Sequence, residues 1–174
     1  SYLRSLCVLL GLDPDDAAPV LRATRAMERA MGQVPDEPVR VFVPIWREPW
    51  MTFDGRAFAS DLLELCGAQN VFADRPRRYP LAADLGRAEP LTGARVAERD
   101  TRYPRVTLGE VEGRAPQAIL LPDEPYRFGE REAAELRGLG VPAARDDAIV
   151  FTSGKDLFWY GTRLAGAIER LRSV

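Results

Sequence analysis

The sequence contains no histidine, a single lysine and two cysteines, and each scarcity removes a class of function. Without imidazole, Ser-His-Asp and Cys-His nucleophile systems and the common zinc and manganese sites built on histidine are excluded. The only lysine, Lys155, lies in Thr-Ser-Gly-Lys, which lacks the upstream glycine that a phosphate-binding loop requires. Cys7 and Cys66 are too few and too far apart for a metal knuckle. The sequence leaves open whether they are bonded to each other.

Long apolar runs and runs of one charge are also missing. No stretch is apolar for long enough to cross a bilayer, and residues 1–10 lack the basic and apolar regions of a signal peptide. The net charge is −2 and basic residues are scattered among acids, so nothing indicates a nucleic-acid partner. With 174 residues, 46% of them hydrophobic, the chain is long enough to bury a core.

The first part of the chain, residues 1–34, is predicted to be a helical segment. Residues 1–10 form an amphipathic stripe of Leu3, Leu6, Cys7 and Leu10, and we expect further residues to precede it in the complete protein. A second helix is predicted over 17–31, with one apolar face. That face consists of Val20, Thr24, Met27 and Met31.

Residues 35–174 alternate between strand and helix patterns, which predicts an α/β lobe. The β-branched run 39–45 indicates a strand covered on both faces, and Gly67 ends the helix predicted over 58–66. Further strands are predicted at 70–72, 117–121 and 148–151, and further helices from 107, over 130–139 and over 162–172. The alternation favours a three-layer sandwich in which helices cover both faces of a mostly parallel sheet.

Residues 74–105 differ from the rest of the lobe, because they are rich in proline and charge and carry little apolar periodicity. We predict a long surface excursion. Arg-Tyr-Pro occurs twice within it, at Tyr79 and at Tyr103. Either tyrosine is a candidate for the edge of a ligand cleft, and an equally good interpretation is a ring that covers apolar loop residues.

Aromatic residues gather where predicted strands end. Trp46 and Trp50 follow the first strand, and Trp159 and Tyr160 follow the last. Because open α/β sheets bind ligands at the carboxyl ends of their strands, these rings are candidate walls of a cleft, although half-buried caps over the sheet edge are the alternative. Arg163 is a candidate partner for a ligand carboxylate or phosphate, or a cation lying over the neighbouring rings.

Five segments, taken in order, resemble a known family. They are residues 41–51, 62–72, 102–107, 118–126 and 159–164. Together they are similar to the carboxy-terminal lobe of the cobalamin- and siderophore-type periplasmic binding proteins of ABC importers. The resemblance covers about residues 17–171, and it makes the helix at 17–31 the later part of the helix that joins the two lobes of such receptors.

The resemblance implies a solute-binding role without catalysis and without a cofactor of the protein's own. It implies a ligand such as cobalamin, haem or a ferric siderophore, an ABC importer permease as partner, and a periplasmic or cell-surface location. In similar receptors a surface glutamate on each lobe docks into permease arginines, which makes Glu124 the first candidate here, followed by Glu130 and Glu132. The family's amino-terminal lobe is absent from this sequence, so only one wall of a binding cleft is expected.

Two other functions compete with this interpretation. A hydrolase would need paired carboxylates, for which Asp54, Asp61, Glu64, Asp123 and Glu124 are the candidates, but no spacing places two of them on one surface. A free-standing interaction module of the same fold, which binds a protein through the exposed cleft wall, is the main alternative to transport.

Overall fold

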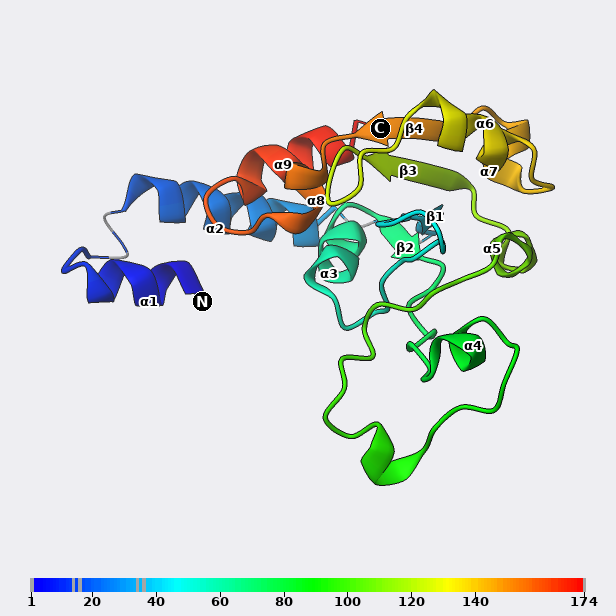
Figure 1. The fold of residues 1–174 in the computed structure, drawn as a ribbon. Helices are drawn as coiled ribbons and strands as arrows, with labels where there is room; N and C mark the ends of the chain where they lie inside the picture. Colours follow the sequence, from blue (N-terminus) through cyan, green and yellow to red (C-terminus); the bar gives the residue numbers. More distant parts are fainter. Residues whose placement is uncertain (1, 14, 16, 34, 36, 174) are drawn as a thin grey trace.

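The computed structural model describes the whole chain except residues 1, 14, 16, 34, 36 and 174, and its centre is a parallel sheet (Figure 1). The strands are β1 (Val39–Phe42), β2 (Ala68–Asn70), β3 (Ala118–Pro122) and β4 (Ile149–Thr152). They lie in the order β2-β1-β3-β4, and every neighbouring pair is parallel. All described carboxyl ends of the sheet therefore point to one edge.

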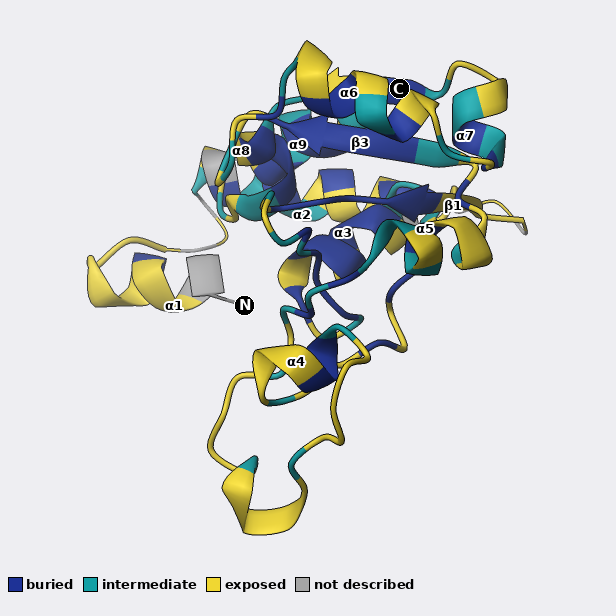
Figure 2. Cartoon of the chain, turned by 45° about the vertical axis from the view of Figure 1, so that its right-hand side comes forward, coloured by how far each residue is buried: buried dark blue, intermediate teal, exposed yellow. Residues whose placement is uncertain are grey.

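Helices cover both faces of this sheet, which confirms the predicted three-layer α/β class. The helices are α1 (Tyr2–Leu9), α2 (Ala18–Met31), α3 (Phe58–Leu65), α4 (Leu81–Asp84), α5 (Leu108–Arg114), α6 (Glu130–Arg137), α7 (Pro142–Arg145), α8 (Gly154–Phe158) and α9 (Leu164–Leu171). The short 3₁₀ helix η1 (Gly93–Arg95) lies in the excursion. Figure 2 shows that β3 is almost wholly buried while the excursion and α1 are largely exposed.

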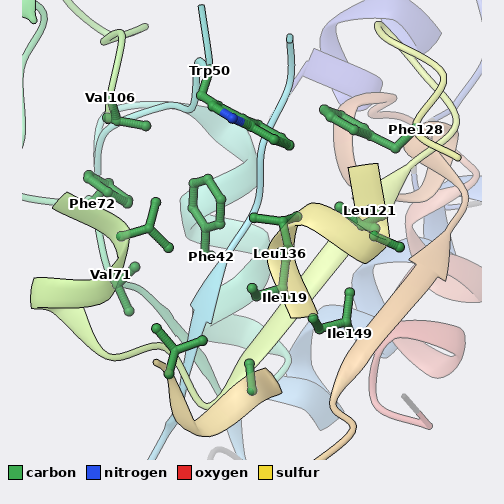
Figure 3. Close-up of a cluster of buried hydrophobic side chains, with 14 residues drawn as sticks. Phe42, Trp50, Val71, Phe72, Val106, Ile119, Leu121, Phe128, Leu136 and Ile149 are labelled. Carbon is green, nitrogen blue, oxygen red and sulfur yellow. The ribbon is translucent and has the colours of Figure 1, made fainter. Parts of the chain in front are cut away.

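Alternate strand residues supply the two cores, as the period of two of a β-strand requires. Phe42, Ile119 and Leu121 pack with residues of α5, α6 and α7 on one face (Figure 3). Val41 and Leu120 pack with residues of α3 and α8 on the other. Both faces of the central strands are thus covered, as their β-branched composition predicted.

Helix α2 packs along α9 through small side chains. Val20 is buried as predicted, but Met27 is 38% exposed, and the buried residues that follow Val20 on the helix are Ala23, Ala26 and Ala30. The predicted face was therefore wrong beyond its first turn, because a close approach to α9 favours alanine over methionine. The side chain of Met31 lies outside the described residues.

Helix α1 lies apart from the sheet in both views (Figures 1 and 2). Cys7 is buried, but Leu6 and Leu10 of the predicted stripe are exposed, and the side chain of Leu3 is outside the described residues. Periodicity identified the helix correctly, and no described residue packs on most of its apolar stripe. None of the described helices is long and apolar enough to cross a membrane. The two cysteines are free thiols.

Three predicted element positions need correction. The second strand was predicted at 70–72 and lies at 68–70, so Val71 and Phe72 are buried residues that follow it. Residues 155–161 were predicted as a loop, but the turn after β4 contains α8. Helix α7 was not predicted, because four residues are too short for a helical period to show. The capping box at Thr107 and Glu110 was predicted correctly.

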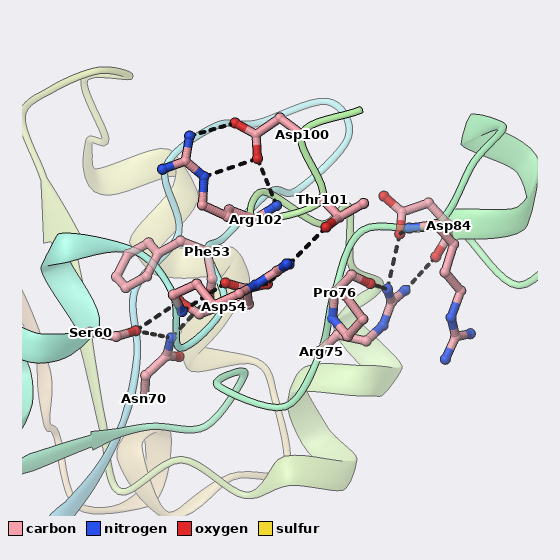
Figure 4. Close-up of polar contacts among 12 residues, drawn as sticks. Phe53, Asp54, Ser60, Asn70, Arg75, Pro76, Asp84, Asp100, Thr101 and Arg102 are labelled. Carbon is pink, nitrogen blue, oxygen red and sulfur yellow. Dashed lines mark hydrogen bonds and ion pairs between the residues drawn. The ribbon is translucent and has the colours of Figure 1, made fainter. Parts of the chain in front are cut away.

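The excursion over 74–105 is exposed along most of its length, as predicted, but its base is fixed (Figures 1 and 4). Arg75 and Asp84 form a buried ion pair of 3.0 Å. The Asp84 carboxylate also accepts hydrogen bonds from the backbone N–H groups of Arg78 and Arg105. One side chain therefore joins the first part of the segment to its end. Its far part extends away from the sheet.

Candidate functional site

A hollow of about 650 Å³ lies at the carboxyl edge of the sheet. Its walls are Ile45, Tyr103, Glu124, Pro125, Phe158 and Trp159. These residues come from three chain segments that follow β1, β3 and β4 and from the end of the excursion. In an open parallel α/β sheet this edge is where ligands bind.

The backbone explains how each wall residue reaches the hollow. Ile45 and Glu124 follow β1 and β3 closely in the chain, while Phe158 ends α8. Tyr103 is distant in sequence and is placed by backbone pairing: Thr52 N–H donates to the carbonyl of Pro104 at 3.1 Å, and Asp54 N–H donates to that of Arg102 at 2.8 Å. The end of the excursion is thus tied to the segment after β1.

Trp159 presents the largest open aromatic surface of the hollow. The residue is 50% exposed, and the Lys155 ammonium lies 5.4 Å from its ring centroid. The neighbouring Phe158 packs edge-on against Phe53 of the core at 6.0 Å, which anchors the segment that carries Trp159. An exposed indole on an anchored backbone is suited to contact with a large flat ligand.

Glu124 is half-buried and lies against the start of α8. A Cβ atom at Gly154 would come within 2.4 Å of the Glu124 carbonyl oxygen, so only glycine fits this approach. The adjacent Asp123 accepts the backbone N–H of Gly154 at 2.7 Å. The loops after β3 and β4 are therefore joined, and Glu124 forms part of the hollow's wall.

Arg163 does not line the hollow and instead pairs with Asp156 at 3.5 Å. Asp156 is buried and also accepts two hydrogen bonds of 2.6 Å from Arg170. Hydrogen bonding by Arg170 lowers the pKa of the Asp156 carboxyl, which keeps it ionised. The guanidinium of Arg163 thus has a partner within the protein and lies outside the hollow, and its contact with a ligand stays a prediction.

The two tryptophans after β1 have different environments. Trp50 is only 5% exposed and stacks on Phe128 at 5.8 Å with the rings nearly parallel (Figure 3). Trp46 is 45% exposed and packs edge-on against Tyr126 at 5.6 Å. Trp50 is a core residue with no open ring face, and Trp46 covers the sheet edge beside the hollow without lining it. The cap interpretation therefore fits Trp46, whereas Trp50 is part of the core.

Two further aromatic candidates lie outside the hollow. Tyr160 is exposed and meets Phe58 of α3 edge-on at 5.9 Å. Tyr79 lies within the excursion, where its hydroxyl donates to the carbonyl of Asp100 at 2.8 Å. Of the seven predicted ligand contacts, the structure brings Tyr103 and Trp159 together at one hollow.

The acidic docking candidates are also separated by their environments. Glu130 begins α6 at the surface and pairs with Arg137, whose hydrogen bond lowers the pKa of the carboxyl. Glu132 is buried, where its carboxylate accepts the backbone N–H of Gly129 at 3.0 Å. This bond belongs to the capping of α6, so Glu132 is not available for docking.

Sequence reasoning missed three wall residues, Ile45, Pro125 and Phe158. Each adjoins a segment that had been singled out, since Phe158 precedes Trp159 and Pro125 follows Glu124. The available signal was position: the residues that immediately follow parallel strands meet at one edge. Ile45 had been predicted as the last residue of the strand over 39–45 and lies three residues beyond the end of β1.

A second hollow, of about 370 Å³, lies at the opposite, amino edge of the sheet. Val39, Cys66, Ala118 and Ala148 are among the residues that line it. Burial raises the pKa of the Cys66 thiol to about 11, so the sulfur stays protonated and unreactive at neutral pH. The amino-edge hollow thus lies at the other end of the strands from the carboxyl-edge hollow.

No protein-family model and no curated protein sequence matches the chain. Solved structures do match. The chain is similar to a possible iron-binding, periplasmic solute-binding protein of Staphylococcus epidermidis, with a TM-score of 0.70, 16% identity, and coverage of 98% of this chain and 58% of that chain. It is similar to the periplasmic heme-binding protein RhuT of Roseiflexus, with a TM-score of 0.66, 14% identity, and coverage of 98% and 59%.

The periplasmic vitamin B12 binding protein BtuF of Vibrio cholerae also matches, with a TM-score of 0.56, 19% identity, and coverage of 88% of this chain and 49% of that chain. At these identities the likeness establishes the fold. The predicted resemblance to a lobe of cobalamin-, haem- and iron-binding periplasmic proteins is confirmed at that level. The chain spans between about half and three fifths of the length of these three proteins.

Proposed function

We propose that this chain is one lobe of a solute-binding receptor that presents a metal chelate to the permease of an ABC importer outside the cytoplasm. The hollow at the carboxyl edge of the sheet carries the proposal, because it combines the expected position with an exposed aromatic surface. The similar structures named above support it, since those proteins are named as periplasmic binding proteins for iron, heme and vitamin B12.

The chemistry of the wall favours a ligand that brings its own metal donors. Tyr103 and Trp159 offer ring surfaces, and the sequence has no histidine to coordinate a free zinc or manganese ion. A corrinoid, haem or a ferric siderophore presents a broad, partly apolar surface on which such rings pack. We therefore assign Trp159 and Tyr103 to ligand contact and Glu124 to the polar part of the wall.

Residues 1–34 and 35–174 are proposed to have different roles. In this proposal the second unit is the carboxy-terminal lobe and α2 is the end of the helix that leads into it from an amino-terminal lobe. A single lobe covers one side of a ligand, so water remains on the other side and much of the burial that drives binding is lost.

Permease docking is assigned to Glu130 in place of Glu124. The carboxylate of Glu130 is 70% exposed at the start of α6, whereas Glu124 is half-buried in the wall of the hollow. A docking residue has to reach arginines on another protein, and exposed charges chiefly raise the rate of association. The salt dependence of uptake by the complete receptor would measure this contribution.

Titration of the isolated chain with cobalamin, haem and a ferric siderophore tests the ligand assignment. We expect one of these chelates to bind with a Kd weaker than about 1 μM, because only one wall is present. Trp159→Ala should weaken this binding by about tenfold, since an aromatic contact contributes on the order of 1–2 kcal/mol. Isothermal calorimetry or absorbance titration provides the measurement.

Trp46→Ala is the matched control for this variant. Trp46 has nearly the same exposure, 45% against 50%, but does not line the hollow, so its removal should leave the Kd unchanged. Equal weakening in the two variants would show that exposed tryptophans bind the chelate nonspecifically. Failure of all three chelates to bind at millimolar concentration would refute the ligand assignment.

A further inference from the structure

The excursion over residues 74–105 is the positively charged part of an acidic protein. It contains eight arginines and five acidic residues, a net charge of 8 − 5 = +3. The remaining residues carry sixteen basic and twenty-one acidic side chains, a net charge of 16 − 21 = −5. This charge separation coincides with the segment that extends away from the sheet (Figure 1).

The acids of the excursion do not neutralise all its arginines. Asp84 pairs with Arg75, Asp100 pairs with Arg102, and Asp74 pairs with Arg114 on α5. Within the described chain, by contrast, Arg77, Arg99 and Arg105 have no carboxylate within ion-pair distance. Asp84 lies near Arg105, but its oxygens already accept hydrogen bonds from Arg75 and from two backbone N–H groups.

Tyr79 brings two of these arginines, Arg77 and Arg99, together. The guanidinium carbon of Arg77 lies 4.3 Å from the centroid of the Tyr79 ring, and that of Arg99 lies 4.8 Å from it. The ring is held in place because its hydroxyl donates to the carbonyl of Asp100 and its own carbonyl accepts the N–H of Leu91. Arg77 is fixed as well, by a backbone hydrogen bond of 2.7 Å to Thr101.

Arg105 lies close enough to Arg77 for the two charges to interact. Burial and the neighbouring Arg77 charge lower the pKa of the Arg105 guanidinium, while Asp84 and Tyr79 act in the opposite direction. One of its N–H groups reaches the carbonyl of Tyr103 at 3.4 Å. Like charges gathered in this way repel each other, and a bound anion would remove that repulsion.

We propose that Arg77, Arg99 and Arg105 around Tyr79 form a binding site for a phosphate-type oxyanion. A guanidinium donates two parallel hydrogen bonds to such a group, and stacking on a fixed ring holds its plane while its N–H edges remain available. None of the three arginines lines the hollow of the proposed receptor site, so this inference does not depend on chelate binding.

Two kinds of ligand carry such an oxyanion: a free phosphate ion and the phosphodiester headgroup of an anionic lipid. Calorimetry of the chain with inorganic phosphate tests the first source. Co-sedimentation with vesicles of phosphatidylcholine alone, or with one third phosphatidylglycerol, tests the second. Binding to phosphate identifies a free oxyanion, and binding only to the anionic vesicles identifies a headgroup at a membrane surface.

The double variant Arg77→Gln with Arg99→Gln should weaken binding of whichever probe binds by about tenfold or more, because two of the three guanidiniums are removed. The double variant Arg87→Gln with Arg95→Gln is the control. It makes the same change of charge in the same segment at two exposed arginines that do not contact Tyr79, and it should retain binding within about twofold.

The proposal is overturned if neither probe binds the unaltered chain, or if the two double variants lose binding equally, which would indicate general electrostatic attraction. Circular dichroism and the melting temperature establish that each variant is folded. Arg77→Lys with Arg99→Lys provides a second test if the glutamine variant does not fold. It keeps both charges and loses the planar donors, so binding should still weaken relative to the unaltered chain.

Discussion

Asp84→Ala is expected to lower the free energy of unfolding by about 3–5 kcal/mol, the loss typical when one partner of a buried ion pair is removed. The side chain of Asp84 is fully buried and that of Arg75 is 4% exposed, so alanine removes a buried partner of the guanidinium and leaves it paired with Glu110 alone, at 3.0 Å. The backbone N–H groups of Arg78 and Arg105 lose their acceptor at the same time. Urea denaturation followed by circular dichroism measures the change.

Asp100→Ala is the matched control for this prediction. It removes the same charge from the same segment, but the Asp100–Arg102 pair is nearly half exposed on both sides, and water replaces it at little cost (Figure 4). A much smaller loss is therefore expected. If the two variants were equally stable, Asp84 would not anchor the excursion.

Trp50→Ala should destabilise the protein by about 3–5 kcal/mol, because a buried aromatic side chain is replaced by a cavity. Trp50 packs in the core cluster shown in Figure 3, with Phe128 stacked on one face and the Arg47 guanidinium 4.9 Å from the ring centroid. Thermal and chemical denaturation both report this loss. The result would establish Trp50 as a packing residue.

Two variants define the origin of that effect. Trp50→Phe should be much less destabilising, because the indole N–H has no acceptor within the described structure and phenylalanine preserves an aromatic stack. Trp46→Ala should also have a small effect on stability, since that ring is 45% exposed. A Trp50→Ala variant as stable as Trp46→Ala would return Trp50 to the list of candidate wall residues.

The comparison of Trp50 with Trp159 shows why the fold was easier to predict than the site. Both residues follow a strand and stand beside charged residues, so their local patterns are equivalent. Their burial is decided by tertiary partners, since Phe128 covers Trp50 while Trp159 remains half exposed. Alternation of strands and helices predicted the sheet because burial on both faces leaves a local signal. Contacts between residues of distant loops leave no such local signal in the sequence.

The excursion gives a second example. Its proline and charge content predicted exposure correctly, but the sequence did not reveal that Asp84 is buried within it. A carboxylate in a charged loop has the same local pattern whether it is solvated or paired with Arg75. The buried arrangement arises where the chain returns at Arg105, whose backbone N–H donates to the Asp84 carboxylate. For the same reason, spacing did not reveal that Arg163 pairs with Asp156.

The central claim is that the ligand contacts the hollow at the carboxyl edge of the sheet, and paramagnetic NMR tests it most directly. A ferric siderophore that binds the ¹⁵N-labelled chain weakly should broaden the amide signals nearest the iron. We expect broadening at Ile45, Tyr103, Glu124 and Trp159, which line the hollow. Broadening confined to Cys66 and Ala148 at the amino-edge hollow, or spread evenly over the chain, would contradict it.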